Sequence, residues 1–170
     1  LVAENIDVGL RLGCVLEGGF VVSRLMDTNY HVVASPDYIR KHGRPKLPNQ
    51  LRDHECVHFS LPGFGTVWKF CDRSEQTEDV TVSGRLRTGN ALAIRRAALA
   101  GLGIAMLADW TISSELADES LIDLFPDYRV TATDFETAAW IVYPSRAYVP
   151  AKTRVFIDYL RETCRTGLVR

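Results

Sequence analysis

The sequence predicts an α/β protein, because strand-like and helix-like segments alternate along almost the whole chain. Stretches with an apolar residue at every second position are separated by alanine-rich or amphipathic stretches that carry helix caps. The composition is that of a globular protein with one domain or two small lobes, since 46% of the 170 residues are hydrophobic and 24% are charged. The alternation favours mostly parallel sheets.

The first half of the chain is predicted to contain strands on either side of a well-capped helix. Residues 6–13 and the end of residues 20–35 have strand character. A short helix is expected to begin at Pro36 and to end near Gly43, because proline suits the first helical turn and glycine suits the position after the last. A brief helix and a strand at 56–61 follow. The apolar residues of the first strand that are expected to face inward are Ile6, Val8, Leu10 and Leu12.

The second half is predicted to alternate more regularly. Its clearest helix has Asn90 as its N-cap, continues through "ALAIRRAALA" and stops at Gly101. The last segment, "VPAKTRVFIDYLRETC", is predicted to be an amphipathic helix with Val149, Phe156 and Leu160 on its apolar stripe. The other expected elements are strands at 66–72, 79–88, 104–108, 121–126 and 135–144 and a helix at 109–120.

The segment "HECVH" matches the H-E-x-x-H pattern of zinc peptidases. That chemistry needs His54 and His58 on one face of a continuous helix, with Glu55 as general base and a third protein ligand. Here the apolar period changes to two within the motif, at Val57. We therefore expect His54 to end a short helix and His58 to lie on the outer face of a strand, and the zinc hydrolase remains a remote alternative.

Other chemistry-bearing motifs are weak or absent from the sequence. The glycines of "GLG" follow a helix and precede a strand, which is the wrong order for a dinucleotide loop, and the sequence contains no G-x-S-x-G elbow. The formal net charge of −1 argues against a dedicated nucleic-acid surface. No apolar stretch reaches the ~18 residues of a membrane span. The cysteines are scattered along the sequence, so we expect them to be reduced thiols in a cytoplasmic protein. They are Cys14, Cys56, Cys71 and Cys164.

Three loops have the character of anion-binding sites. "RLRTGNAL" passes from a strand through Thr88 and Gly89 to Asn90 at a helix N-terminus, where free N–H groups can hold a carboxylate or a phosphate. "VVASPDY" repeats the arrangement with Ser35. The loop that begins at Gly13 follows the carboxyl end of a strand, where open α/β sheets place their ligands. Together these loops favour a cleft for a small molecule.

Several segments of the sequence resemble a known protein family. The segments "IDVGLRLG", "VASPDYI", "GLGIAML" and "YPSRAYVPAKTRVFIDYL" are similar to the effector-binding domain of LysR-type transcriptional regulators, and the resemblance covers nearly the whole chain. It implies a two-lobed fold like that of type 2 periplasmic binding proteins, with two hinge crossover strands at "YHVVAS" and "WIVYP". Lobe I would consist of residues 1–34 and 144–170, and lobe II of residues 35–143.

The resemblance also implies a function and a site. The chain would be a non-enzymatic sensor without a cofactor that binds a small, anionic or aromatic effector between the lobes, as a cytoplasmic homodimer or homotetramer that does not engage membranes. DNA would be bound only through a winged helix-turn-helix domain that this chain lacks. The first part of lobe I is also expected to be missing from the chain. The positions that match the cleft loops of the family are Gly13, Cys14, Ser35, Phe64, Gly65, Thr88, Gly89 and Asn90. A solute-binding protein of the same fold is the alternative.

Overall fold

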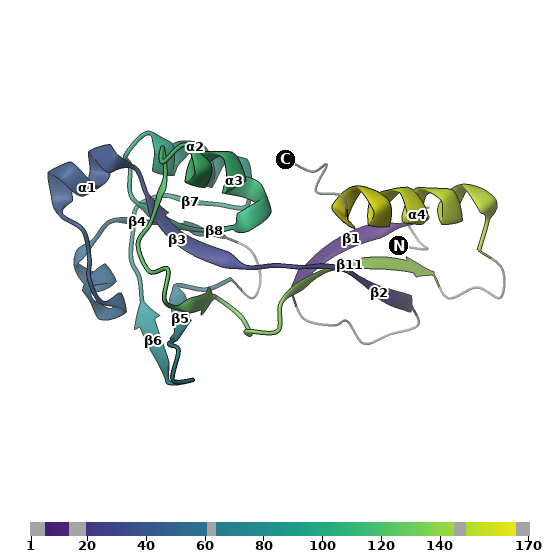
Figure 1. The fold of residues 1–170 in the computed structure, drawn as a ribbon, viewed down its shortest axis with the longest axis horizontal. Helices are drawn as coiled ribbons and strands as arrows, with labels where there is room; N and C mark the ends of the chain where they lie inside the picture. Colours follow the sequence, from purple (N-terminus) through teal and green to yellow (C-terminus); the bar gives the residue numbers. More distant parts are fainter. Residues whose placement is uncertain (1–5, 14–19, 61–63, 145–148, 166–170) are drawn as a thin grey trace. The chain divides into compact units, whose positions relative to one another are not determined.

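The computed structural model describes residues 6–13, 20–60, 64–144 and 149–165 (Figure 1). Its contacts divide the chain into two compact units. The first unit combines residues 1–28 with 136–170, and the second contains residues 29–135. Each unit has its own sheet and its own helices.

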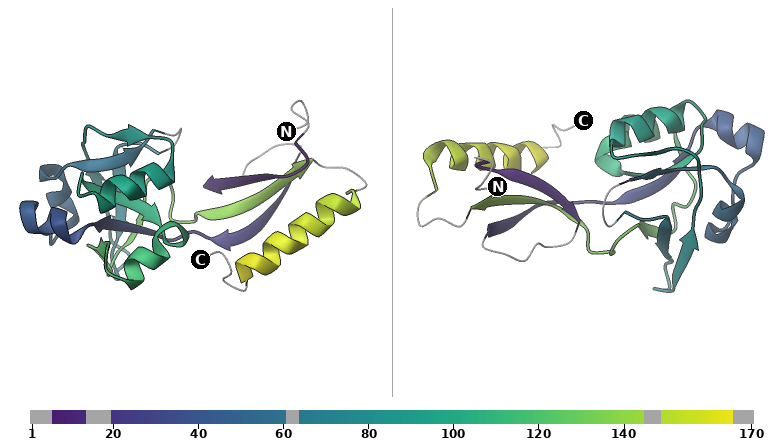
Figure 2. Two further views of the ribbon diagram at one scale, coloured as in Figure 1. Left: turned by 90° about the horizontal axis from the view of Figure 1, so that it is seen from above. Right: turned by 180° about the vertical axis from the view of Figure 1, so that it is seen from behind.

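The first unit is a three-stranded antiparallel sheet in the order β1-β11-β2, packed against one helix. The helix α4 lies along the sheet on the side of β2 (Figure 2), and the Arg161 guanidinium donates a hydrogen bond to Ser23 Oγ of β2 at 2.7 Å. The elements of this unit are β1 (Gly9–Gly13), β2 (Phe20–Asp27), β11 (Ala138–Pro144) and α4 (Ala151–Arg165).

Two expectations for this unit are wrong. Leu10 and Leu12 of β1 are 56% and 48% exposed, although their alternation predicted that they face inward. The buried residues of α4 are Thr153 and Ile157, whereas the expected stripe residue Phe156 is 48% exposed. The alternation of β1 does establish two faces, but which face is covered depends on where α4 packs, and α4 packs beside β2.

The second unit contains a larger mixed sheet in the order β6-β5-β10-β3-β8-β4-β7, with β9 paired to β3. Among the described strands only β4 is parallel to its neighbours, β7 and β8, so the expectation of mostly parallel sheets is wrong. Its strands are β3 (Tyr30–Ala34), β4 (Cys56–Phe59), β5 (Val67–Cys71), β6 (Thr77–Thr81), β7 (Arg87–Thr88), β8 (Ile104–Ala108), β9 (Ile122–Asp123) and β10 (Arg129–Thr131).

The core of the second unit lies on both faces of β8, whose five residues are all buried. Helices α2 (Ala91–Leu99) and α3 (Asp109–Ala117) cover one face, where Ile94 and Ile112 pack (Figure 1). Trp68, Phe70 and Leu51 belong to the cluster on the other face. A strand buried on both faces has no polar alternation, which explains why "IAMLA" is apolar throughout.

The cap signals of the second unit are confirmed. Helix α1 (Pro36–His42) begins with Ser35 as its N-cap and ends at Gly43, whose φ of 83° is in the region that favours glycine. Asn90 caps α2. A 3₁₀ helix, η2 (Pro48–Asp53), corresponds to the brief helix expected before β4. These features are local, so the sequence alone predicts them.

The two connections between the units leave the first unit side by side. The backbone N–H of Thr28 donates to Thr137 O at 3.3 Å, and Thr137 Oγ1 donates to Thr28 O at 3.1 Å. The chain enters the second unit at Asn29 and leaves it at Phe135. The lobe bounds at residues 34 and 143 that the resemblance implies stay a prediction.

His31 of β3 gives the second unit a testable dependence on pH. Its Nδ1 lies 2.7 Å from a carboxylate oxygen of Asp123 on β9, and this hydrogen bond raises the pKa of His31 above 6.5. The protonated form stabilises the fold, so its contribution of about 1 kcal/mol is fully present below pH 6.5 and is lost as the pH rises through the folded pKa. Denaturant unfolding of His31→Gln should lack this loss, whereas His42→Gln on α1 should keep it. If the parent, His31→Gln and His42→Gln all lose the same stability as the pH rises, the role of the His31–Asp123 hydrogen bond is contradicted.

Candidate functional site

A small hollow lies in the second unit, at the carboxyl end of β4. Its side chains pack so closely that no space the size of a water molecule is left between them. The residues that line it are His58, Phe59, Phe64, Gly65, Trp68, Met106 and Ala132. One imidazole therefore lies in surroundings that are otherwise apolar.

The sheet explains why these side chains meet. β4 and β8 are parallel neighbours, which brings His58 near Met106, and β5 supplies Trp68. The ring of Phe64 packs at 5.4 Å from that of Phe59 and edge-on at 6.2 Å from that of Tyr30. Phe64 and Gly65 were expected in the site, and the structure places both in this hollow.

His58 is the lining residue whose environment the sequence did not reveal. It is 4% exposed, so the expectation that it lies on the outer face of a strand is wrong. The reason is that β4 is a central strand between β7 and β8, and both of its faces are covered. A sequence signal was present, because "CV" places two apolar residues on opposite faces directly before His58.

Thr88, Gly89 and Asn90 lie beside the end of β4. Thr88 is the register partner of Phe59, and its carbonyl accepts a hydrogen bond from the Ser60 N–H at 3.1 Å. Asn90 Oδ1 accepts from the N–H groups of Leu92 and Ala93 at 2.9 and 3.3 Å. The N-terminus of α2 therefore begins close to the hollow, with two of its free N–H groups already satisfied by the cap.

Ser35 is not brought together with these residues. β3 is antiparallel to β8, whereas β4 is parallel to β8. The carboxyl ends of β3 and β4 therefore lie at opposite ends of the strands of this sheet. The Ser35 side chain is also occupied, because its Oγ caps α1 by accepting from the Tyr38 N–H at 3.3 Å. Within the second unit, Ser35 is a helix cap away from the hollow.

The two remaining expected residues belong to the first unit. Gly13 is the last residue of β1, where it pairs with Ala138 of β11. Cys14 lies outside the described residues. The structure thus places Phe64 and Gly65 in the hollow with His58, Trp68 and Met106, and Thr88 pairs with Phe59, which also lines it.

The H-E-x-x-H motif does not form a helix here. His54 is the C-cap of η2, and its Nδ1 lies 3.1 Å from the Tyr38 hydroxyl, whereas His58 is in β4. Burial lowers the pKa of His54, and Glu55 binds Arg85 rather than facing either histidine. In the part of the chain that the structure describes, no three His, Cys, Asp or Glu side chains are grouped to hold a metal ion.

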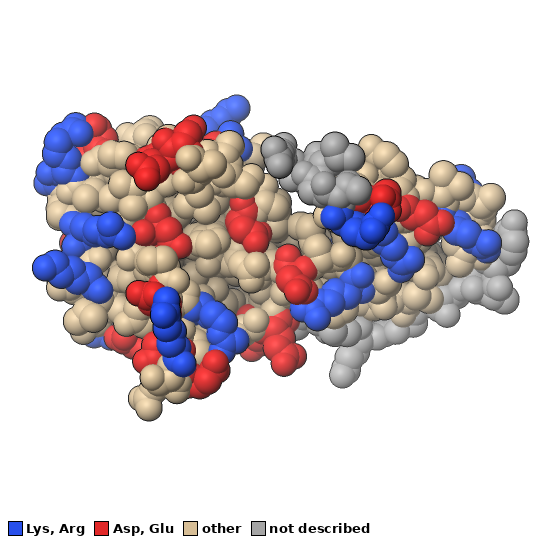
Figure 3. Space-filling model, viewed as in Figure 1, with Lys and Arg blue, Asp and Glu red and all other residues tan. Residues whose placement is uncertain are grey.

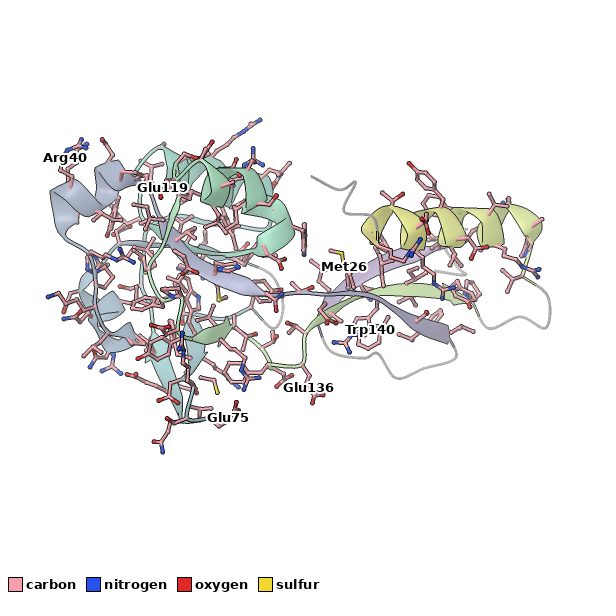
Figure 4. All side chains as sticks on the ribbon, viewed as in Figure 1. Met26, Arg40, Glu75, Glu119, Glu136 and Trp140 are labelled. Carbon is pink, nitrogen blue, oxygen red and sulfur yellow. The ribbon has the colours of Figure 1, made fainter. Side chains whose placement is uncertain are left out.

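Neither sign of charge dominates the face of the molecule drawn in Figure 3, as far as the described residues show. On the face drawn in Figure 3, acidic and basic residues are interspersed. Glu75, at the tip of the β5–β6 hairpin in Figure 4, pairs with Arg129 at 2.5 Å. Among the helices that the structure describes, none is long and apolar enough to span a membrane.

The two helix caps give a matched pair of predictions. Asn90→Ala and Ser35→Ala should each lower the free energy of unfolding by about 1 kcal/mol, because each removes a side chain that satisfies helix N–H groups. Asn90→Ser should keep most of the stability, since serine caps nearly as well. Chemical denaturation measures all three, and an unchanged Asn90→Ala protein contradicts the capping role.

Comparison with known proteins decides the family. The model of the LysR substrate binding domain matches residues 1–165. The chain belongs to this family. The expected fold class, α/β and like the periplasmic binding proteins with two crossovers, is confirmed by solved LysR-type regulatory domains. The structure of the CrgA regulatory domain from Neisseria meningitidis has a TM-score of 0.80 at 30% identity, covering 95% of this chain and 77% of that one.

Relatives of this LysR substrate-binding domain are transcriptional regulators. The HTH-type transcriptional regulator CrgA of Neisseria meningitidis serogroup C (strain 8013) is 32% identical over 99% of this chain and 54% of its own length. PtxR of Pseudomonas aeruginosa is 31% identical over 95% of this chain and 50% of its own length. The chain thus spans about half the length of these relatives.

Proposed function

We propose that this LysR substrate-binding domain is the ligand-sensing part of a bacterial transcriptional regulator. The observation that carries the proposal is the family match, together with two compact units that the chain connects twice. A domain of this kind acts by binding a small effector and needs neither catalysis nor a cofactor. The whole protein would bind DNA through a winged helix-turn-helix outside this chain.

The paired connections suggest how binding would be transmitted. Thr28 and Thr137 hold the two connections together through hydrogen bonds, so a change at one connection is shared by the other. An effector that contacts both units would favour one angle between them over another. It can shift that equilibrium only through its different affinities for the two states.

The assembly and the surroundings follow from the same proposal. In the cytoplasm, the regulator would form a homodimer or a homotetramer, because closed symmetry is the common arrangement of soluble homo-oligomers. The effector-contacting positions would be Gly13, Cys14, Phe64, Gly65 and the Thr88–Asn90 turn. Ser35 is a weaker candidate, since its hydroxyl caps α1 and it lies at the other edge of the sheet.

The alternatives have no specific observation in their favour. A solute-binding protein would share the fold, but the two relatives described above are regulators. A zinc hydrolase would need His54 and His58 on one helix, and they lie in different elements.

Thermal unfolding in the presence of a metabolite set tests the proposal. The set should contain small carboxylates, aromatic acids, amino acids and sugar phosphates, each added singly to the purified chain. A true effector at a hundred times its dissociation constant stabilises the fold by about 2.7 kcal/mol. Titration calorimetry should then give one site per chain. If no member of the set shifts the unfolding transition, the sensing role is contradicted.

A further inference from the structure

One arginine joins the helices α2 and α3 of the second unit. Arg95 of α2 pairs through its Nε with Glu115 Oε1 of α3 at 3.1 Å, and its Nη1 donates to Thr111 O at 3.2 Å. Glu115 is only 7% exposed, so its carboxylate needs a cation as its partner. Both contacts go to α3, so a single planar guanidinium holds that helix at two points.

The two points lie on either side of a kink in α3. Ile112, which follows Thr111, has a non-helical φ of −132° and ψ of 17°. A kink in a helix has an identifiable cause, such as a side chain that inserts into its ladder of hydrogen bonds. The donation from Arg95 to Thr111 O is an insertion of this kind. Arg95 therefore fixes the angle between the first turn of α3, residues 109–111, and the rest of the helix.

The first turn of α3 also holds the start of the second unit. The Asp109 N–H donates to Asn29 O at 2.9 Å, and the side-chain amide of Asn29 donates to Asp109 Oδ2 at 3.1 Å. Asn29 is the residue at which the chain enters this unit. A shift of the first turn would therefore move Asn29 with it.

The same turn carries a buried donor without a partner. Trp110 Nε1 is buried and makes no hydrogen bond among the described residues. An unpaired buried N–H costs free energy, so a movement of this turn that gives the indole a partner would be favourable in itself. The first turn of α3 is therefore poised to move, and the contacts of Arg95 oppose that movement.

We infer that Arg95 is a positioning residue that couples the N-terminus of α2 to the connection at Asn29. The inference rests on the proposed function, because the Thr88–Asn90 turn at that N-terminus is among the proposed effector contacts. A displacement of α2 moves the guanidinium, and the guanidinium moves the first turn of α3. This turn in turn moves Asn29, so Arg95 acts without touching the effector.

Hydrogen–deuterium exchange of the whole 170-residue chain tests the link from Arg95 to Asn29. Arg95→Lys keeps a positive charge beside Glu115 but loses the planar fork that reaches both partners. The Asp109 amide, which donates to Asn29 O, should exchange about fivefold faster or more, since the turn that holds it loses a hydrogen bond from a charged group. Arg96→Lys makes the same change at an exposed neighbour and should leave this rate within about twofold of the parent.

A fluorine label on Trp110 tests the link from α2 to α3. Asn90→Ala loosens the start of α2, because it removes the cap of the Leu92 and Ala93 N–H groups. In protein labelled with 5-fluorotryptophan, the resonance of Trp110 is identified by its loss in Trp110→Phe. Asn90→Ala should shift this resonance when Arg95 is present, and the shift should fall by about half or more in the Arg95→Lys protein.

A second set of substitutions keeps the test decisive if Arg95→Lys does not fold. Arg95→Gln together with Glu115→Gln removes both charges at once, so no buried carboxylate is left without a partner. The shorter amide cannot hold both Thr111 O and residue 115. This double variant should therefore reproduce the fast exchange of the Asp109 amide.

Two results would overturn the inference. If the Asp109 amide exchanges at the parent rate in the Arg95 variants, Arg95 does not hold the first turn of α3. If Asn90→Ala shifts the Trp110 resonance equally with and without Arg95, the two helices are coupled through other contacts. Neither result bears on effector sensing itself, which fails only if the metabolite set produces no stabilisation.

Discussion

Replacing Gly84 with alanine should destabilise the protein by about 3 kcal/mol or more. A Cβ at this position would lie 1.7 Å from Cys56 O and 2.7 Å from Cys56 C, which are backbone atoms of β4. The neighbouring Ser83 carbonyl accepts a hydrogen bond from the Cys56 N–H at 2.9 Å, so the two backbones are held at this short separation. The added methyl group can be accommodated only if the chain moves away from β4.

This change should also affect the hollow, because residues 83–88 continue along β4 toward Thr88. The matched control is Gly65→Ala, where the nearest atom to an added Cβ is Val67 N at 3.9 Å. That control should unfold within about 0.5 kcal/mol of the parent. Urea denaturation compares the two variants, and equal stabilities would mean that the close approach of Gly84 to β4 does not exist in solution.

Phe70→Ala should cost about 3–5 kcal/mol of unfolding free energy. The Phe70 side chain is fully buried on β5 and contacts the rings of Phe125 and Tyr128 edge-on, with centroid distances of 5.5 and 6.1 Å. Truncation removes the transfer free energy of the ring and leaves a cavity beside the rings of Phe125 and Tyr128. The protein should therefore unfold at a clearly lower denaturant concentration than the parent.

The control for Phe70 is on the same strand. Val67 is 37% exposed, so Val67→Ala should cost less than about 1 kcal/mol. Phe70→Leu keeps much of the apolar volume and should fall between the two alanine variants. Denaturant melts monitored by tryptophan fluorescence are suitable, because Trp68 lies two residues away. A Phe70→Ala protein as stable as Val67→Ala would contradict the central position of this ring.

Each helix boundary that sequence patterns placed correctly depends on a local interaction. Asn90 satisfies N–H groups two and three residues away, and Pro36 and Gly43 fix the ends of α1 through their own backbone preferences. The family resemblance was equally accessible, since its segments are contiguous, and the family comparison confirmed it. Phe64 and Gly65, which position matches predicted as site residues, both line the hollow, and their role in binding an effector stays a prediction.

Sequence patterns did not correctly predict the directions of the strands or the burial of individual side chains. Leu10 and Leu12 alternate like inward residues, but α4 covers the side of β2 instead. Ser35 and Asn90 are both N-caps that follow a strand, yet the antiparallel pairing of β3 with β8 places their strands' carboxyl ends at opposite ends of the sheet.

The sequence by itself determined the α/β class, the capped helices and the membership of the LysR substrate-binding family. Only the tertiary structure decided that His58 is buried beside Trp68 and Met106, and that the zinc-like motif is divided between η2 and β4. The physical reason is range. Caps and turns depend on neighbours along the chain, whereas burial and strand direction depend on which distant segments pair, and that choice is made by the whole sheet.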